Sequence, residues 1–498
     1  MAKKYLSIII SVVLIACIFA SCVAGGGNEG EGVTLVTQTT TEKAQDTTSF
    51  KLSYSQSDSL NPYQSTTLNN QVLQTLVYES LFAINNNYEA ETMLATGFVY
   101  KDATTLSVTI PSGLLFSDGT KITASAVVNS FYNAKSSPHW QNSLAYITGA
   151  AAMDDNTIDF YLSHPQSMAQ NLLTFAIAKS EPDEKGYYIG SGRYVFNEGN
   201  GQVFIETNKN KTAFNPYFTK IVLVNITAPE SIRNAVNIGN ISWTYLDLAD
   251  ADQSRKTCGK KAVNLNNMVY IGINNTYSVT SNANIRKAIS LAVDRETLVK
   301  SAYQGRANCA TSVFNPATPT GKATAIFSKT ANTAAAKQAI AQSGYDQSQL
   351  KISILTNENT NRVATAQLVK QQLEAVGFEV TVNIQSNESY QAMVSNLSFD
   401  IYIGETKIPN DMSLNSFFAS GGATSYGISL DNSAAASAYN RYLYNNAEIG
   451  NFMLEFSEEM PFVPLVYRQG MICYSKSIQG DIQGSYENYF ANIEDWHY

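Results

Sequence analysis

Histidine, tryptophan and charge are all scarce in this chain. Its 498 residues include three histidines and three tryptophans, and only 15% of them are charged. The histidines, His139, His164 and His497, lie far apart and no Cys-x-x-Cys pair occurs, so the usual ligand spacings of a zinc site are missing and no metal is expected. Three histidines are too few for most catalytic triads and no Gly-x-Ser-x-Gly elbow occurs, so we expect no catalytic residue and no enzymatic activity.

Long basic runs are also absent. The chain carries 33 Lys and Arg against 41 Asp and Glu, which gives a formal net charge of −8. A protein that binds nucleic acid through its phosphates shows a basic patch or stripe, so nucleic acid is not an expected partner. The chain is instead rich in apolar side chains: 44% of the residues are hydrophobic and 11% are aromatic. This composition is typical of a folded protein, and the length is that of about three domains.

The N-terminus has the pattern of an export signal. Lys3 and Lys4 precede an uncharged stretch, residues 5–20, which suits a signal-peptide core but is short for a membrane-spanning helix. The stretch ends in Phe19-Ala20-Ser21-Cys22, which resembles the lipobox of bacterial lipoproteins, where the cysteine is lipidated. Cys17 is a second candidate but would leave a core of about ten residues. We therefore expect residues 1–21 to be a signal peptide and Cys22 the lipidated residue; an ordinary cleaved signal peptide is the alternative.

Residues 22–47 are expected to form a flexible tether. They are rich in Gly, Thr, Glu and Gln and have little apolar content, a composition that does not bury enough surface to order itself. Three glycines in it spell Gly-x-Gly-x-x-Gly, but no strand pattern precedes them and no helix pattern follows, so no dinucleotide cofactor is expected. Beyond the tether one disulfide with one thiol, or three buried thiols, remain open for Cys258, Cys309 and Cys473.

The folded part of the chain opens with a mixture of strands and helices. Phe50–Tyr54 alternates as a strand, and residues 72–81 carry apolar side chains three and four apart, as in an amphipathic helix. Further on, alternating runs at 106–110 and 157–162 predict strands. Between them we expect one helix, which begins after Thr123 because the threonine side chain can cap its free amide groups.

The second half shows longer regular patterns. Residues 285–303 have the apolar spacing of one long amphipathic helix. After it, residues 351–355 alternate as a strand, residues 362–376 have helical spacing, and residues 379–384 alternate again. A strand, a crossover helix and a second strand make a unit of a parallel sheet, so the fold class is α/β.

Seven short motifs spread over the folded part match, in order, those of one known family. They include an Asp-Gly turn that leads into a capped helix, a glycine turn and a two-part helical motif. In this chain they read Leu60-Asn61-Pro62, Tyr78-Glu79-Ser80-Leu81, Leu94-Ala95, Phe116-Ser117-Asp118-Gly119-Thr120, Gly190-Ser191-Gly192-Arg193-Tyr194, Ile285-Arg286-Lys287-Ala288-Ile289 with Ala292-Val293-Asp294-Arg295-Glu296, and Pro461-Phe462-Val463-Pro464-Leu465. On these motifs the chain resembles the large solute-binding proteins of bacterial ABC importers, specifically the peptide- and nickel-binding family.

The resemblance implies a two-lobed, periplasmic-binding-protein-like fold with an extra inserted domain, and lobes that close around a ligand by a hinge. It divides the chain into three domains. Domain I comprises residues 48–79, 185–262 and 468–498, domain II residues 80–184, and domain III residues 263–467.

The function that the resemblance implies is capture of a peptide, or a similar amine-bearing small solute, and its delivery to ABC permease subunits. The protein is then a monomer without a cofactor, held at the extracytoplasmic face of the cell membrane by its lipid. Three alternatives share the fold: a peptide-binding sensor or chaperone, a binder of nickel chelates, and a binder of oligosaccharides.

The resemblance also points to an acidic residue. In the peptide-binding relatives an acid shortly after a strand ending in Gly-Trp accepts the peptide's N-terminal ammonium, and a buried ammonium needs such a partner. Here the strand at 399–403 is followed by Gly404-Glu405-Thr406, with Glu405 in place of the tryptophan. The usual position of the acid falls on Ile408, so we expect Glu405 or Asp411 to take the role, with solvated loop acids as the alternative.

Three further residues are candidates for the cleft by position. They are Thr66 and Thr67, which follow the first turn, and Tyr390; ordinary packing or surface exposure is the alternative for each. Certain dipeptide-binding relatives also carry an arginine that clamps the ligand's carboxylate, just after the strand that corresponds to residues 351–355. This chain has Thr356-Asn357-Glu358 there, so no fixed two-ended dipeptide clamp is expected.

Overall fold

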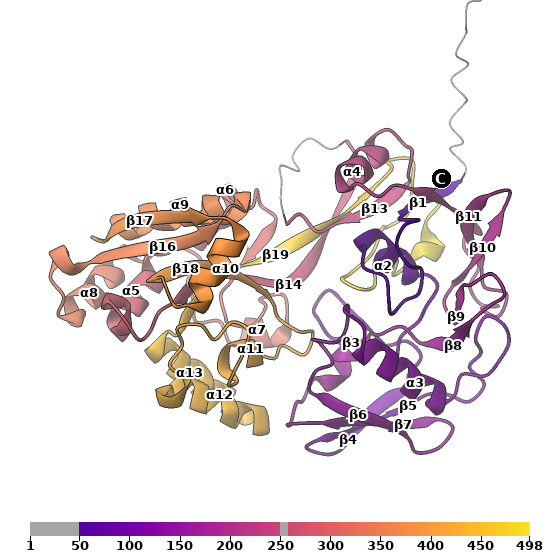
Figure 1. Cartoon of the computed structure of the whole chain (residues 1–498), viewed down its shortest axis with the longest axis horizontal. Helices are drawn as coiled ribbons and strands as arrows, with labels where there is room; N and C mark the ends of the chain where they lie inside the picture. The colour runs from indigo at the N-terminus through magenta and orange to yellow at the C-terminus, as the bar shows by residue number, and fades with distance from the viewer. Residues whose placement is uncertain (1–48, 250–256) are drawn as a thin grey trace, which may run out of the picture. The chain divides into compact units, whose positions relative to one another are not determined.

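The computed structural model describes residues 49–249 and 257–498 (Figure 1). The expected signal peptide, the tether and both candidate lipidation sites, Cys17 and Cys22, lie outside the described residues. Within the described ranges, no helix is both long enough and apolar enough to cross a bilayer. The expected α/β class is confirmed by a mixed sheet with helices packed on it.

An eleven-stranded mixed sheet is the largest element. Ten strands follow the order β10-β11-β12-β1-β13-β19-β14-β18-β16-β17, and β15 pairs with β19. Their bounds are β1 Phe50–Tyr54, β10 Tyr194–Gly199, β11 Gln202–Thr207, β12 Lys220–Asn225, β13 Trp243–Leu246, β14 Gly259–Ile273, β15 Ala307–Cys309, β16 Lys351–Asn357, β17 Glu379–Gln385, β18 Ile401–Lys407 and β19 Phe462–Tyr474. The central strands β14 and β19 pair antiparallel, whereas β1 and β16 pair in parallel with their neighbours.

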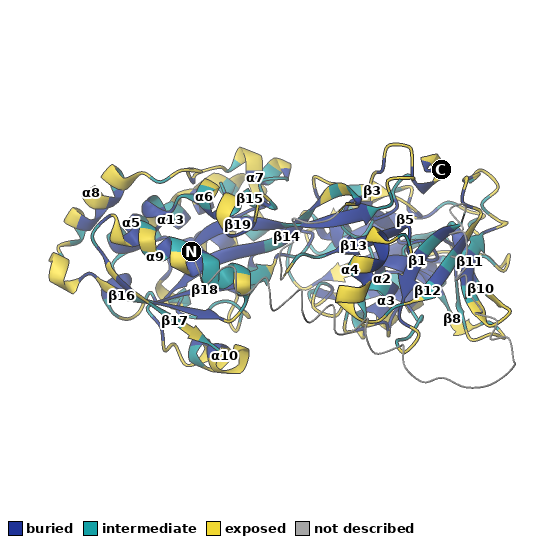
Figure 2. Cartoon of the chain, turned by 90° about the horizontal axis from the view of Figure 1, so that it is seen from above, coloured by how far each residue is buried: buried dark blue, intermediate teal, exposed yellow. Residues whose placement is uncertain are grey.

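Strands β14 and β19 each contribute to both of the large hydrophobic cores. The first core contains the apolar residues of β1 together with Trp243 and Tyr245 of β13, and Val263 of β14 and Ile472 of β19 belong to it. The second core contains those of β16 and β18, and it takes Ile271 of β14 and Val466 of β19. The pairing of the two strands shifts register between Asn264 and Met268, where the core changes. Figure 2 shows both strands as predominantly buried. Two adjacent strands therefore connect the cores.

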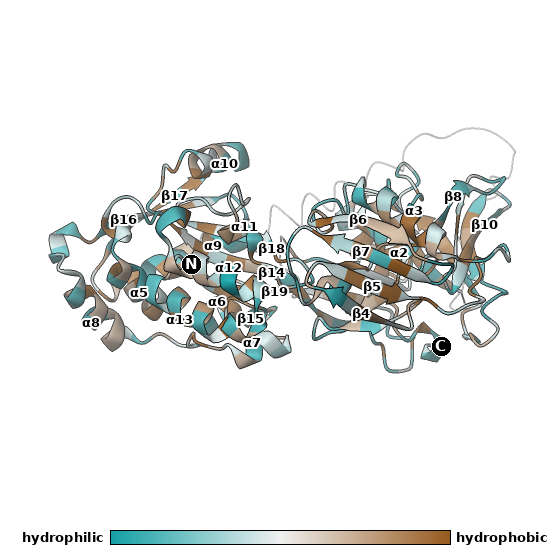
Figure 3. Ribbon diagram, turned by 90° about the horizontal axis from the view of Figure 1, so that it is seen from below, coloured by the Kyte–Doolittle hydropathy of each residue, from teal (hydrophilic) through white to brown (hydrophobic). Residues whose placement is uncertain are grey.

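A four-stranded antiparallel sheet and two short ladders complete the strands. The sheet has the order β4-β5-β7-β6, and β2 pairs with β3 and β8 with β9. The bounds are β2 Phe82–Ile84, β3 Ala90–Thr92, β4 Gly97–Asp102, β5 Thr105–Thr109, β6 Ile147–Ala152, β7 Thr157–Leu162, β8 Ala178–Pro182 and β9 Tyr188–Gly190. Figure 3 shows hydrophobic residues along β5 and β7, whose inner faces belong to the first core. The strands expected at 106–110 and 157–162 are confirmed.

Most of the longer helices begin at a side-chain cap. The α-helices are α2 Leu68–Gln74, α3 Ala124–Lys135, α4 Pro229–Asn237, α5 Ala283–Ala292, α6 Arg295–Ser301, α7 Pro319–Ala323, α8 Thr333–Ser343, α9 Thr360–Glu374, α10 Asn387–Ser395, α11 Asn415–Phe418, α12 Ala434–Tyr444 and α13 Ile449–Glu459. Thr123 accepts from the backbone amide of Ala126, as expected, and Asn359 caps α9. Helix α9 packs on β16 and β17, which pair in parallel, so the predicted strand, helix, strand unit is confirmed.

Two predicted helices are wrong in extent. The single helix expected over 285–303 is two helices, α5 and α6, because Asp294 leaves the helix and accepts from the backbone amide of Thr297 at 2.8 Å as the cap of α6. The helix expected over 72–81 ends at Gln74. The carbonyl of Val77 instead accepts from the amide of Gly192 at 2.9 Å. The chain after α2 is therefore held by the glycine turn and cannot continue the helix.

The sequence motifs hold the fold together. A Cβ on Gly192 would lie 2.4 Å from the carbonyl carbon of Val77, so only glycine fits this close approach. Arg286 donates to the carbonyls of Glu459 and Met460 at the end of α13. The buried Arg295 donates to the carbonyl of Pro464, which joins the helical motif to the apolar run near the C-terminus. These motif residues make backbone contacts within the protein and explain folding rather than ligand choice.

The three cysteines of the folded part are thiols. Cys258 and Cys473 are buried in one small cluster, and Cys309 is half-buried. No disulfide joins them in the described structure. Of the two alternatives that the sequence left open, three thiols is therefore the one observed, with two of the thiols buried. Burial raises the pKa of the Cys309 thiol.

Candidate functional site

Glu405 lies within strand β18, whereas the sequence predicted that the strand ends before this residue. The strand extends to Lys407, and Glu405 pairs across the ladder with Val269 of β14. Its carboxylate accepts from Arg468 Nε at 2.6 Å and from Asn267 Nδ2 at 3.0 Å, and Arg362 Nη2 lies 3.4 Å away. Burial opposes ionisation of Glu405, but the charges of Arg468 and Arg362 outweigh it and hold the pKa of the carboxyl below its usual value.

Arg468 of β19 links Glu405 to Asp247 on the other side of the sheet junction, because it contacts both carboxylates. Its Nη1 atom lies 2.9 Å from Oδ1 of Asp247, the residue that follows β13. The arginine side chain is 4% exposed, whereas that of Asp247 is 46% exposed. Burial lowers the pKa of Arg468, but the two carboxylates raise it by more, so the guanidinium stays charged. Together Glu405, Arg468, Arg362 and Asp247 form a charge-balanced cluster, called the junction cluster below.

Asp411, the second predicted acid, is enclosed by hydrogen-bond donors. Its carboxylate accepts from the hydroxyl of Tyr146, from Gln166 Nε2 at 3.1 Å and from the backbone amide of Ser413 at 3.1 Å. The residue is 2% exposed. Burial raises the pKa of Asp411 to about 6, although the hydrogen bonds oppose this. Its carboxylate is therefore already surrounded by protein.

The other predicted residues also have contacts within the protein. A Cβ on Gly404 would lie 2.5 Å from the ring of Tyr270, so this glycine makes room for the aromatic side chain. Thr406 pairs with Met268 in the β18–β14 ladder. Tyr390 is buried and donates to the carbonyl of Ile403 at 2.9 Å. The position at which the resemblance places the acid, Ile408, is part of the second core.

Thr66 and Thr67 bind one carboxylate rather than an open cavity. Both hydroxyls donate to Asp58, at 3.1 Å from Thr66 and 2.6 Å from Thr67. Burial opposes ionisation of Asp58, but these hydrogen bonds outweigh it and lower its pKa to about 2. Thr67 nevertheless lines a groove of about 380 Å³, which is bounded by the starts of α2 and α4 and by Asp247. The groove thus reaches the junction cluster.

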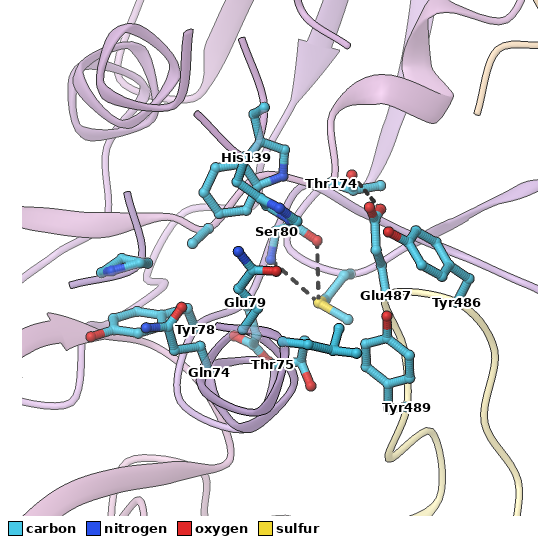
Figure 4. Close-up of a pocket in the computed structure, with 16 residues that line it drawn as sticks. Gln74, Thr75, Tyr78, Glu79, Ser80, His139, Thr174, Tyr486, Glu487 and Tyr489 are labelled. Atoms are coloured by element: carbon cyan, nitrogen blue, oxygen red, sulfur yellow. Dashed lines mark hydrogen bonds between the residues drawn. The ribbon is translucent and has the colours of Figure 1, made fainter. Parts of the chain in front are cut away.

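A second pocket, with a cavity volume of about 70 Å³, shares Leu68 with this groove (Figure 4). Aromatic side chains line it, among them Trp140, Tyr486 and Tyr489. Its polar lining includes Gln74, His139 and Glu487, and Figure 4 shows Thr174 hydrogen-bonded to Glu487. We call it the aromatic chamber. Its cavity volume is below the range of ligand sites, about 300–1,000 Å³, whereas that of the groove lies within it.

His139 is a neutral side chain in this chamber. Burial lowers the pKa of the imidazole, and the opposing charge of Glu487 does not outweigh it. At neutral pH the ring therefore brings no positive charge to the lining. Across the described residues, no group of three or more His, Cys, Asp and Glu side chains is placed to hold a metal ion.

Sequence reasoning missed the basic residues of the site and Glu487. Arg468 is flanked by the apolar run Phe462–Tyr467 and by Met471-Ile472-Cys473, and a charge isolated in such a strand is a signal that could have found it. Arg362 lies in the first turn of a helix, where nothing distinguishes it from a surface residue. Glu487 lies in an irregular segment with no periodic pattern.

One family model matches most of the chain. The family model of "Bacterial extracellular solute-binding proteins, family 5 Middle" matches residues 89–425, more than half of the chain. A glutathione-binding protein, GsiB, from Shigella flexneri serotype 5b is 22% identical over 467 residues, which cover 84% of this chain and 89% of that protein.

Two solved structures show the same fold. The ABC transporter substrate-binding protein CtaP from Listeria monocytogenes has a TM-score of 0.70 at 18% identity, with 90% of this chain and 99% of that chain covered. The putative peptide-binding protein AppA from Clostridium difficile has a TM-score of 0.68 at 19% identity, with 85% and 95% covered. The two-lobed solute-binding fold expected from the motifs is thereby confirmed. The chain belongs to the bacterial extracellular solute-binding proteins of family 5.

Proposed function

We propose that this protein captures a peptide, or a similar amine-bearing small solute, and delivers it to the permease subunits of an ABC importer. The groove and the aromatic chamber, which meet at Leu68 next to the ion-paired junction cluster, carry this proposal. The names of the relatives support it, because glutathione is an amine-bearing tripeptide and AppA is described as a putative peptide-binding protein. The members of the family are solute-binding proteins. Catalysis forms no part of the proposal.

Capture requires a conformational change in this proposal. A ligand shifts an equilibrium between open and closed lobes only if it binds the closed state better. β14 and β19, which join the two cores, are the natural hinge. The proposed division is domain I at 48–79, 185–262 and 468–498, domain II at 80–184 and domain III at 263–467. The proposed unit is a monomer.

The carboxylate that receives the amine is proposed among the acids around this region. Glu405 and Asp411 are the acids that the sequence suggested. Glu487 and Glu79 both line the aromatic chamber, and Glu79 is paired with Lys211 at 2.7 Å, which leaves Glu487 as the candidate there. Thr67 keeps a proposed role as a lining residue of the groove. The remaining candidates are proposed to act through the contacts within the protein that are described above. They are Gly404, Thr406, Thr66 and Tyr390.

A thermal-shift screen of the purified protein tests the proposal. Di- to octapeptides and glutathione should raise the melting temperature by several °C at about 100 times the dissociation constant, because ligand binding then adds about 2.7 kcal/mol to stability. Simple sugars and nickel–histidine complexes are the arms for the alternative ligand classes. A shift with one of these and none with any peptide would replace the peptide assignment.

We further propose that the protein is anchored at the extracytoplasmic face of the membrane through a lipid on Cys22. The sequence around this residue carries the proposal. In cells given a labelled fatty acid, the wild type should be labelled and fractionate with membranes. Cys22→Ala should lose both properties and Cys17→Ala should keep them. Labelling that depends on Cys17 would move the anchor, and an unlabelled wild type would indicate an ordinary signal peptide.

A further inference from the structure

The acids suggested by the sequence are already compensated in this structure. Glu405 lies against two guanidinium groups, of Arg468 and Arg362. Asp411 accepts three hydrogen bonds and is almost fully buried. An ammonium group that approached either carboxylate would have to displace these partners. A carboxylate with remaining capacity at an open pocket is a better acceptor for a ligand's cation.

Glu487 is such a carboxylate. It lines the aromatic chamber, and its Oε2 atom accepts from Thr174 Oγ1 at 2.9 Å and from Asn410 Nδ2 at 3.1 Å. Both donors are neutral, so they orient the carboxylate without cancelling its charge. Its other oxygen, Oε1, lies 4.0 Å from Lys407 Nζ, beyond hydrogen-bond distance. One carboxylate oxygen is therefore available for a charged donor.

Lys407 is held by a different residue. Its ammonium donates to the hydroxyl of Tyr486 at 2.7 Å and lies 4.3 Å from the centre of the same ring. The lysine side chain is 41% exposed, and its contact with Glu487 is a long ion pair. Burial lowers the pKa of Lys407, but Tyr486 and Glu487 together raise it by more. The lysine can retain its contact with Tyr486 while a ligand's ammonium approaches Glu487.

A tight turn fixes the position of Glu487. Ser485 and Asn488 exchange backbone hydrogen bonds of 3.1 and 3.2 Å and close a tight turn, with Tyr486 and Glu487 between them. Glu487 has φ of 63°, in the left-handed region, which glycine and asparagine adopt more easily than glutamate. Eight other non-glycine residues in the described part of the chain share this region, so the turn fixes where the carboxylate lies but does not by itself mark a ligand site.

The chamber also contains a donor without a partner. Gln74 is 5% exposed, and its Nε2 atom is buried with no hydrogen-bond partner among the described residues. A buried amide that lacks an acceptor is costly, so its presence in a pocket lining indicates that a ligand supplies the acceptor. A carbonyl or carboxylate oxygen has that chemistry. Trp140, Tyr486 and Tyr489 offer apolar faces to the body of the same ligand.

We propose that Glu487 binds the ammonium group of the ligand in the aromatic chamber, and that Gln74 donates to a carbonyl or carboxylate oxygen of the same molecule. The ligand class is a short peptide or amino-acid derivative with a free amine and an apolar or aromatic side chain. The inference rests on the proposed function, since it assumes capture of a small solute, and it selects Glu487 over Glu405 and Asp411 as the acid.

Calorimetry with paired probes tests this assignment. The probes are Ala-Phe and glutathione, each with a free and with an N-acetylated amine. The wild type should bind the free amines at least about tenfold more tightly, the expected effect of one charge-assisted hydrogen bond. Glu487→Gln should lose this preference, and Gln74→Met should weaken both forms while keeping it. Glu494→Gln, on an exposed residue of the same segment, is the matched control and should behave as the wild type.

The outcomes separate the two proposals. If Glu487→Gln kept the preference for free amines and Glu405→Gln lost it, the assignment to Glu487 would be overturned while solute capture stood. Equal binding of free and acetylated probes by the wild type would remove the ammonium site altogether. A wild type that binds none of the probes but a sugar or a nickel complex would overturn both the peptide class and this inference. Because the preference is a ratio within one variant, altered folding does not imitate its loss.

Discussion

Replacing Arg468 by methionine should destabilise the protein by about 3 kcal/mol, the low end of the range for breaking a buried ion pair. Arg468 makes the shorter of the two ion-pair contacts with Glu405, at 2.6 Å against 3.4 Å for Arg362. The Glu405 side chain is only 13% exposed. Without Arg468 a buried carboxylate keeps one distant cation and the amide of Asn267. Methionine fills similar space but carries no charge, so the cost is electrostatic.

A double-mutant cycle isolates this interaction. Glu405→Gln removes the other charge, and the pair of substitutions should cost about 1–3 kcal/mol less than the sum of the single changes, because neither then leaves a buried charge alone. The loss in Arg468→Met should also shrink as the pH falls, since protonating Glu405 removes the uncompensated charge. Urea denaturation at several pH values measures both effects.

Arg441→Met is the matched control for this prediction. Arg441 also contacts a glutamate, Glu448, but at 3.8 Å, and its side chain is 54% exposed. Exposed pairs contribute up to about 1 kcal/mol, so this substitution should leave stability nearly unchanged. Equal effects of the two methionine substitutions, or additive effects in the cycle, would show that the junction cluster does not act as a buried unit.

Local patterns predicted the elements of the fold where one pattern dominated. The strand Phe50–Tyr54 and the unit β16, α9 and β17 are correct because period-two and helical spacing alternate clearly there. The break between α5 and α6 was missed because the apolar spacing continues past it, although Asp294 carries a capping signal. The early end of α2 was missed because a glycine turn more than a hundred residues later holds its continuation.

The junction cluster could not be read from local patterns, because it is assembled across the sheet. Glu405 is on β18, Arg468 on β19 and Arg362 at the start of α9, and the sheet order places β14 between β18 and β19. Sequence separation hides such pairs unless the strand order is known. The sequence did locate Glu405 as an acid of interest, but the partners that decide its charge balance came only from the structure. Glu487 is positioned by a turn in which it adopts the left-handed conformation itself. A glutamate in a sequence does not predict this conformation, so its place in the chamber could not be predicted.

The stability of the protein should also depend on the ionisation of Asp411. Burial raises the pKa of Asp411 from 3.8 to about 6 in the folded chain. Between these values the folded chain keeps a proton that the unfolded chain has lost, so raising the pH favours unfolding. The stabilisation is complete below pH 3.8 and is lost as the pH rises through 6. At 1.36 kcal/mol per pH unit the interval corresponds to about 3 kcal/mol.

Asp411→Asn removes this dependence, and the difference in unfolding free energy between variant and wild type reports it without the contribution of other groups. Relative to the wild type, the variant should gain about 3 kcal/mol between pH 3.5 and pH 7. Its amide keeps an oxygen for the Ser413 backbone and a donor for the Tyr146 hydroxyl. Asp431→Asn, on an exposed acid, is the control and should give a flat difference. A flat difference for Asp411→Asn would mean that the carboxylate is ionised in the folded chain. That would mean that the hydrogen bonds from Tyr146, Gln166 and the Ser413 amide outweigh burial, as the threonine hydrogen bonds do at Asp58.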